Sequence, residues 1–480
     1  MEHPDWVLKH KRKGTELRFI RGTYYLYEVK SRWNPEKKRA QKITGRLLGK
    51  ITPNGFIPSP KYELSHKPLR PLTVKEYGAT YLIFSVIDDV INKLADIFPS
   101  CFKELITAAS MKVLHHCPAK NMDFFFRCSY LSERYPDVSL SEKRISSLFR
   151  EIGSMRDSIT SFFRSLINKR ENDYVLMDAT HLFSKSQSID IARTGYNSKH
   201  DFEPQVNLLF IYSVSLTLPV YYRIVPGNLR EVKAFTLTLK ESGIKDAVLI
   251  ADKGFYSEAN IKRLEEEGLT FIIPLRRRSA LINYSPLEKT DKKGMDGYFK
   301  YSGRYIWYYS YPLEGGRFVH CFLDERLRIE EQRDYLSRIE THPETHSIEG
   351  FYERQHRFGT LAVLTNLRAS QEDIYIHYKS RNSIEVMIDA MKNVLEADSS
   401  YMRNNMSLEG WMFITYISLI CYYRIYRLLA EKNLLSKYSP LDILKYMSEI
   451  KKVKINGVWY TSEITTKTQK VIEKLGLHIT

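Results

Sequence analysis

The chain has 480 residues, of which 43% are hydrophobic and 27% charged, a composition that excludes disordered, collagen-like and low-complexity proteins. The net charge is +17, and residues 1–70 alone hold 17 Lys or Arg against 6 Asp or Glu. A basic excess concentrated near one end is typical of a polyanion binder. Nucleic acid is the default partner, and an anionic membrane surface is the alternative.

The cysteines and the apolar segments indicate where the protein works. Five scattered cysteines form no C-x-x-C pair, which predicts reduced thiols, a cytosolic protein and no zinc cluster. The first residues lack the apolar core of a signal peptide. The longest apolar run, Trp411 to Tyr423, is shorter than the roughly 18 residues that a membrane helix needs, so we expect a buried helix.

The N-terminal third divides into two patterns. Residues 1–65 predict a basic β-hairpin region, in which a strand from Tyr24 and a returning strand from Arg39 flank a turn. Residues 66–168 carry apolar side chains at helical spacing and predict a DNA-binding module of four or five helices. We expect both parts to bind DNA ends.

Strands and helices alternate from Tyr174 onward. This alternation predicts an α/β core with at least partly parallel pairing, over residues 169–275 and 361–435. Residues 276–360 alternate aromatic and polar side chains and predict a β-rich insertion. The tail, 436–480, predicts a hairpin and a last helix in a small α+β unit, and leaves a dimer or partner contact open.

Two aspartates occupy strand ends in the predicted core. Asp178 lies within YVLMDATH, and Asp252 directly follows the apolar AVLIA. Alone, each would most often cap a turn. On neighbouring strands of one sheet, however, two carboxylates can share a divalent cation, because Mg²⁺ prefers oxygen ligands.

A third carboxylate comes from a helix. Arg381, Glu385 and Lys392 follow Tyr378 at offsets of 3, 7 and 14, within a stripe roughly 60° wide on one helix face. A solvated face with i,i+4 charge pairs would show the same pattern. Asp389 lies on this stripe too, so spacing alone does not decide which carboxylate is a ligand.

The Asp-Asp-Glu set, with its last member in Y-x2-R-x3-E-x6-K, resembles the DDE transposases with RNase H-like catalytic domains. It resembles the insertion-sequence-four superfamily in particular. The stretches DATHLFS, ADKGFYS and LEADSSYMRNN also look like blocks of this family, and the resemblance covers roughly residues 170–435. It implies an RNase H-like core interrupted by the β-rich insertion.

The resemblance also implies a function. The protein would be the transposase of a bacterial-type insertion sequence, located in the cytoplasm with the nucleoid. It would bind terminal inverted repeats and target DNA as a homodimer, and cleave and transfer strands. Asp178, Asp252 and Glu385 would hold two divalent ions, Mg²⁺ or Mn²⁺. A Mg²⁺-dependent nuclease on the same core and a non-catalytic DNA-binding protein are the alternatives.

Five further residues are candidates for DNA contacts. The resemblance places Tyr378, Arg381 and Lys392 at the transposon end. Lys253, beside Asp252, fits either a DNA contact or a solvated lysine. Trp307 lies in the insertion, where some relatives use a tryptophan to hold a flipped base, although a tryptophan among Tyr305, Tyr308 and Tyr309 more often packs in a sheet.

Overall fold

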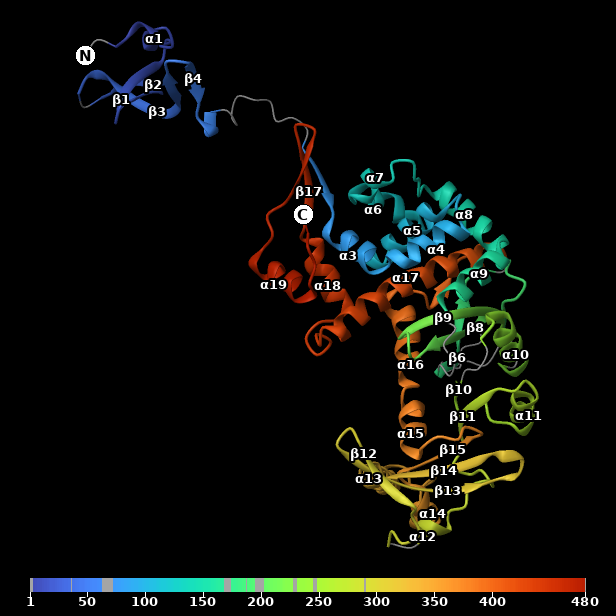
Figure 1. The fold of residues 1–480 in the computed structure, drawn as a ribbon. Helices are drawn as coiled ribbons and strands as arrows, with labels where there is room; N and C mark the ends of the chain where they lie inside the picture. The colour runs from blue at the N-terminus through green and yellow to red at the C-terminus, as the bar shows by residue number, and fades with distance from the viewer. Residues whose placement is uncertain are drawn as a thin grey trace. The chain divides into compact units, whose positions relative to one another are not determined.

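The computed structural model describes residues 3–35, 37–62, 72–167, 174–186, 188–194, 203–227, 231–244, 248–288 and 291–479 (Figure 1). The chain forms two compact units. The first comprises residues 1–75 and 452–462, and the second comprises 76–451 and 463–480.

The first unit contains an antiparallel four-stranded sheet. Its central strands form the predicted basic hairpin, and a short strand is added on each side. In spatial order the strands are β1 (Thr15–Ile20), β2 (Thr23–Asn34), β3 (Arg39–Thr52) and β4 (Gly55–Pro58). A small core of buried side chains lies beneath the sheet, made of Val7, Leu17, Leu26, Leu48 and Ile51.

A second, three-stranded sheet joins β5 (Thr73–Glu76) to the hairpin of β17 (Lys451–Ile455) and β18 (Val458–Thr461). The predicted turn is found at Asn456 and Gly457, which have φ angles of 52° and 87°. Both angles are positive, as a tight two-residue hairpin turn requires.

The helical segment of the second unit holds seven α-helices over residues 78–166, more than the four or five that the sequence predicts. They are α3 (Gly78–Val86), α4 (Asp88–Ile97), α5 (Phe102–His115), α6 (Met122–Cys128), α7 (Leu131–Arg134), α8 (Glu142–Ser154) and α9 (Arg156–Leu166). Pro99, Pro118 and Pro136 follow the ends of α4, α5 and α7. Because proline and the residue before it disfavour helix continuation, the apolar pattern is cut into more pieces than its length suggests.

The long helix α17 (Asn405–Glu431) packs against α5 and α8, and most side chains of its apolar run are buried. Two glycines allow the close crossing with α8. A Cβ on Gly410 would lie 2.0 Å from the carbonyl oxygen of Phe149, and one on Gly153 would lie 1.8 Å from that of Met406. Among the residues that the structure describes, we find no helix with the length and apolar content of a membrane span.

A large mixed sheet forms the centre of the second unit. Its main path runs β12-β13-β14-β15-β11-β10-β6-β8-β7, with β9 beside β8 and β16 beside β6. Strands β7 (Arg193–Thr194) and β16 (Ser399–Ser400) have two residues each. The strands that carry the site are β6 (Tyr174–Ser184), β8 (Pro204–Ser213), β9 (Leu218–Pro226), β10 (Val248–Ile250) and β11 (Thr270–Pro274). β10 pairs parallel with both β6 and β11, whereas β8 pairs antiparallel with β6. The predicted mixed α/β class is confirmed.

Helices α10 (Glu231–Ser242) and α11 (Glu258–Glu266) lie in the intervals between these strands, as predicted. Strands β12 (Gly297–Tyr301), β13 (Arg304–Pro312), β14 (Phe318–Asp324) and β15 (Thr360–Thr365) extend the sheet. The tail ends in α18 (Pro440–Ser448) and the predicted α19 (Thr466–Leu475).

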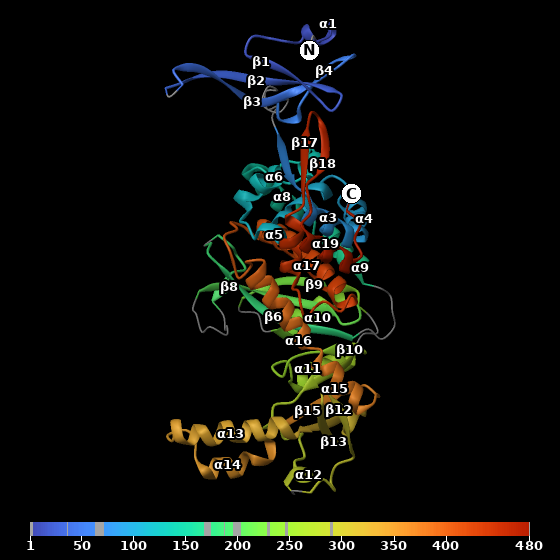
Figure 2. The same cartoon turned by 90° about the vertical axis from the view of Figure 1, so that its left-hand side faces the viewer.

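The insertion also contains helices that the sequence did not suggest, and the two longest of those described lie after β14. They are α13 (Glu325–Thr341) and α14 (Ile348–Arg354), which lie side by side (Figure 2). Helix α13 buries only Tyr335, so it lacks the apolar stripe that identifies a helix in a sequence. Its first turn is capped instead by the Asp324 side chain, which accepts hydrogen bonds from two backbone N–H groups.

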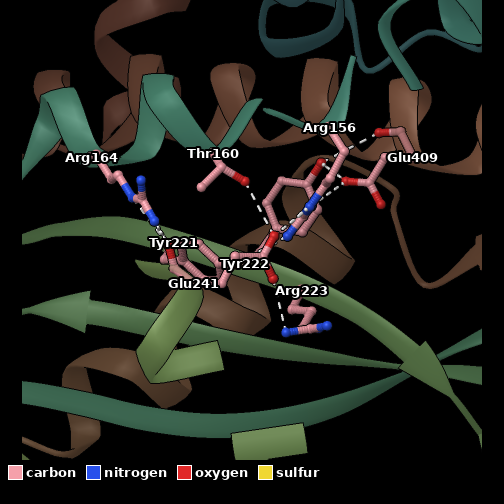
Figure 3. Close-up of polar contacts among 8 residues, drawn as sticks. All are labelled: Arg156, Thr160, Arg164, Tyr221, Tyr222, Arg223, Glu241 and Glu409. Carbon is pink, nitrogen blue, oxygen red and sulfur yellow. Dashed lines mark hydrogen bonds and ion pairs between the residues drawn. The ribbon is translucent and has the colours of Figure 1, made fainter. Parts of the chain in front are cut away.

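A network of partly buried charges joins the helical segment to the sheet (Figure 3). Arg156 on α9 lies 2.8 Å from Glu241 on α10 and 2.8 Å from Glu409 on α17. Arg223 on β9 is 2.8 Å from Glu241, and the Tyr222 hydroxyl donates to Glu409 over 2.9 Å. Two arginines thus balance two glutamates, and pairing of this kind is what makes buried charge tolerable.

Candidate active site

Asp178 and Asp252 both lie just beyond the paired residues of β6 and β10. The sequence predicts each at a strand end. This is right for Asp252, whereas Asp178 lies within β6, because that strand continues beyond β10 and pairs with β8 through Asp178↔Phe210. The last residues that pair between β6 and β10 are Leu176 and Ile250. Asp178 comes two residues after Leu176, and Asp252 comes two residues after Ile250. Parallel pairing therefore brings both carboxylates to one level. A small pocket opens between them, lined by Met177, Asp178, Ala179, Leu209, Ala251, Asp252 and Phe255.

Glu385 reaches this edge from the helical segment that the motif occupies. This segment is divided into α15 (Gln371–Lys379), α16 (Asn382–Asp389) and a π-helical turn (Ala390–Val394). The sequence predicts one regular helix from Tyr378 to Lys392, whereas the helical segment already begins at Gln371, with Ser370 as the N-cap of α15, and is interrupted after Lys379. Arg381 lies in the short break between α15 and α16.

One guanidinium contacts all three carboxylates. Arg381 Nη2 lies 3.5 Å from Asp178 Oδ2 and 3.7 Å from Asp252 Oδ1, and Arg381 Nη1 forms an ion pair with Glu385 Oε1. The side chain of Asp178 is 21% exposed, against 43% for Asp252 and 49% for Glu385. The structure thus brings together residues that are up to 207 positions apart in the sequence.

The electrostatics of the site follow from this arrangement. Burial raises the pKa of Asp178 to about 6, and the charges of Asp252 and Glu385 act in the same direction, while Arg381 opposes them. Burial also raises the pKa of Tyr378, and the charge of Arg381 again lowers it. Three carboxylates facing one guanidinium leave an excess of negative charge, which a cation would neutralise.

The donor set fits a divalent metal chemically, since Mg²⁺ and Mn²⁺ prefer carboxylate oxygens. Within the described residues, however, no group of three or more His, Cys, Asp or Glu side chains is arranged as a metal site. The Arg381 guanidinium lies among the three carboxylates, where a metal ion would bind. Asp178, Asp252 and Glu385 are therefore the residues that could hold an ion once this guanidinium turned elsewhere.

The other predicted site residues have different surroundings. Lys392 lies 3.3 Å from Asp398. It also lies in the π-helical turn, which is wider than an α-helical turn, so Lys392 is shifted from the helix face predicted for a regular α-helix. Lys253 is exposed beside Asp252. Trp307 lies on β13, with its ring centroid 5.1 Å from that of Tyr298. That contact belongs to the sheet of the insertion.

The structure distinguishes the two acidic residues of the helix. Glu385 meets Arg381, whereas Asp389 accepts a hydrogen bond of 2.6 Å from Asn393. The sequence did not suggest that Arg381 lies at the centre of the site. Its only signal in the sequence was its place in the motif, three residues after Tyr378.

The model of the "Transposase DDE domain" family matches residues 169–421, more than half of the chain and the whole of this site. The chain therefore belongs to the DDE transposase family, as its resemblance predicts. As a family, DDE transposases cleave and transfer DNA strands and generally use divalent metals. No curated protein matches the chain.

Among solved structures, the chain is similar to a piggyBac transposase in a synaptic complex with hairpin DNA. The TM-score is 0.41 at 10% sequence identity, over 78% of this chain and 79% of that chain. A likeness of this size carries no argument about the site.

Proposed function

We propose that the protein is the transposase of a bacterial-type insertion sequence of the insertion-sequence-four superfamily, built on an RNase H-like core. It would bind the terminal inverted repeats and target DNA as a homodimer. The observation that carries this proposal is the meeting of Asp178, Asp252 and Glu385 at Arg381, inside the segment that the family model matches.

The three carboxylates are proposed as the ligands of two Mg²⁺ or Mn²⁺ ions. Transposition needs two in-line displacements at phosphorus, first the cleavage of a phosphodiester and then the attack by the freed 3′-OH. Held by these residues, divalent ions would supply activation of the attacking oxygen and neutralisation of the leaving oxygen. Asp178, the least exposed of the three, would anchor such a site, and the more exposed Asp252 and Glu385 would face the DNA.

The basic and aromatic side chains around the site would position DNA. Arg381 can turn from the carboxylates to a phosphate and bind it through a two-pronged fork, whereas Lys392 acts as a point charge. Tyr378, beside Arg381, would pack on a sugar. Lys253 is exposed at the edge of the site and would contact a phosphate, and Trp307 would contact DNA from the insertion.

A cleavage and strand-transfer assay tests this function. A supercoiled plasmid carrying the gene with its natural flanking DNA is incubated with the full chain, Mg²⁺ and a second plasmid as target. We expect cuts at both borders of the element and joining of the freed 3′ ends to the target. Cuts without joining would instead identify a nuclease, and binding without cuts a non-catalytic DNA-binding protein.

A further inference from the structure

The β2–β3 hairpin continues beyond its sheet. Strand β1 pairs with β2 only as far as Glu28, and β4 pairs with β3 only from Gly49. The register between β2 and β3 runs on from Lys30↔Ile43 to Asn34↔Arg39 without a bulge. The described residues 30–35 and 37–43 therefore form a two-stranded extension that no other described strand flanks, as Figure 2 shows in blue. Residues 30–43 are called the ribbon below.

The ribbon is strongly basic. Residues 30–43 contain six Lys or Arg and one Glu. Directly paired residues of an antiparallel ladder lie on the same face. One face, called the reading face below, therefore carries Lys30, Arg32, Asn34, Arg39, Gln41 and Ile43. Apart from the unpaired turn, the opposite face carries a single cation, Lys42, which lies 3.3 Å from Glu16.

The dimensions of the ribbon select one groove of DNA. Two paired strands lie about 4.8 Å apart before their side chains are added. In undeformed B-DNA the minor groove, about 6 Å wide, is too narrow for them, whereas the major groove, about 12 Å wide, admits a two-stranded ribbon. Five residue pairs at a rise of about 3.4 Å extend roughly 17 Å, which is enough to follow several base pairs.

The side chains of the reading face match the chemistry of that groove. Arginine and lysine donate to guanine O6 and N7, and asparagine and glutamine form paired hydrogen bonds with adenine. Arg32 and Gln41 are direct partners across the ribbon, and Asn34 donates to Gln41 over 2.9 Å. Lys37 and Lys38, exposed at the turn, are free to reach phosphates on either side of the groove.

We propose that the reading face of the ribbon enters the major groove at the ends of the element and reads base edges there. The proposal deepens the proposed function and rests on it for the identity of the DNA. It assigns sequence recognition to residues 30–43. Their basic composition alone would explain only attraction to DNA phosphates. A duplex of RNA is excluded as an equal partner, since its major groove is too narrow for side chains to read.

Binding of the full chain to short duplexes tests the proposal, with fluorescence anisotropy as the readout. The probes are the DNA bordering the gene and a scrambled duplex of equal composition. We expect Arg32→Ala and Gln41→Ala each to lower the preference for border DNA about tenfold. Because Gln41 is uncharged, its effect separates base reading from electrostatics. Lys50→Ala, a matched control at the exposed base of β3, should leave the preference unchanged.

Guanine N7 methylation probes the groove itself, because N7 is exposed in the major groove. Methylated border DNA should bind wild type more weakly, and this loss should shrink in Arg32→Ala. If both reading-face variants keep the full preference, or if wild type shows none, the proposal is overturned even where cleavage and joining proceed normally. Conversely, if the variants lose the preference but wild type neither cleaves nor joins, the ribbon reads DNA and the proposed function is wrong.

Discussion

Arg381 is the residue on which the site converges. In the structure its guanidinium contacts three carboxylates at once, and its charge lowers the pKa of Asp178 against the effect of burial. The same side chain is proposed to bind phosphate when DNA is present. The carboxylates and the DNA phosphate would therefore compete for Arg381, whereas Lys392 is already paired with Asp398.

Replacing Arg381 by Ala should weaken binding of a pre-cleaved DNA end by about tenfold to a hundredfold, because a charge-assisted phosphate contact contributes about 1.5–3 kcal/mol. Lys392→Ala should have a smaller effect, since its cation is already paired with Asp398. Anisotropy with a pre-cleaved border duplex measures both. Arg381→Lys keeps the charge but not the two-pronged guanidinium, and it should recover part of the affinity. Unchanged binding in Arg381→Ala would show that Arg381 does not contact the DNA.

Glu76 gives the molecule a pH dependence that is unrelated to the site. Its carboxyl is buried, with Oε1 accepting a hydrogen bond of 2.8 Å from the Ala79 N–H, and burial raises its pKa from 4.5 to about 7. The folded state thus holds a proton that the unfolded state releases. Its contribution to stability is full below about pH 4.5 and is lost as the pH rises toward 7.

Glu76→Gln removes this titration. The variant should melt at a higher temperature than wild type at pH 8 and show little difference at pH 5, with a gap of about 3 kcal/mol at most. Thermal unfolding at the two pH values measures it. The exposed Glu266→Gln is the control and should show no such gap. A stability difference that stays constant with pH would contradict the assignment.

At the scale of elements, the crossing of α8 and α17 depends on glycine. The carbonyl oxygens of Phe149 and Met406 approach Gly410 and Gly153 too closely for any side chain. Gly410→Ala should therefore destabilise the fold by about 1–3 kcal/mol, even though alanine favours a helix by about 1 kcal/mol. Chemical denaturation measures the loss. Ser146→Ala, on the exposed face of α8, should be neutral or slightly stabilising.

The elements that could be predicted from the sequence are those whose apolar pattern is local. The strands around Asp178 and Asp252, the helix at 231–242 and the last helix at 466–475 appear where their periodicity indicates. Helix α13 could not be predicted in this way, because nearly all of its side chains are solvated.

The candidate site was predicted to the level of its residues and not of its geometry. The motif spacing selected Tyr378, Arg381, Glu385 and Lys392, but a regular helix was assumed where the chain has a break and a π-helical turn. That Arg381 meets both aspartates follows from the β6–β10 register and from the packing of α16 near β6. Long-range pairing of this kind leaves no periodic signal in the sequence.

At the scale of the molecule, the helical segment and the catalytic segment belong to one compact unit. They share α17, and the network of Arg156, Arg223, Glu241 and Glu409 fixes α9 to the sheet (Figure 3). Removing residues 1–165 would strip α17 of its partners α5 and α8. Point variants therefore test the DNA contacts of the N-terminal region more cleanly than such a deletion.

The central proposal is that Asp178, Asp252 and Glu385 hold the metal at which DNA is cleaved. Glu385→Gln keeps the size of the side chain and removes the charge that a cation needs, whereas Asp389→Asn makes the same change on a residue that bonds only to Asn393 in the described structure. The two variants are thus matched in chemistry and differ in position.

The most direct measurement is Mg²⁺-dependent cleavage of border DNA by wild type, Glu385→Gln and Asp389→Asn, with DNA binding measured in parallel. Glu385→Gln should cleave at least about a thousandfold more slowly, since several kcal/mol of charge stabilisation are lost, while its DNA binding persists. Asp389→Asn should cleave like wild type. An active Glu385→Gln beside an inactive Asp389→Asn would show that the third ligand is misassigned, and two active variants would place the site elsewhere.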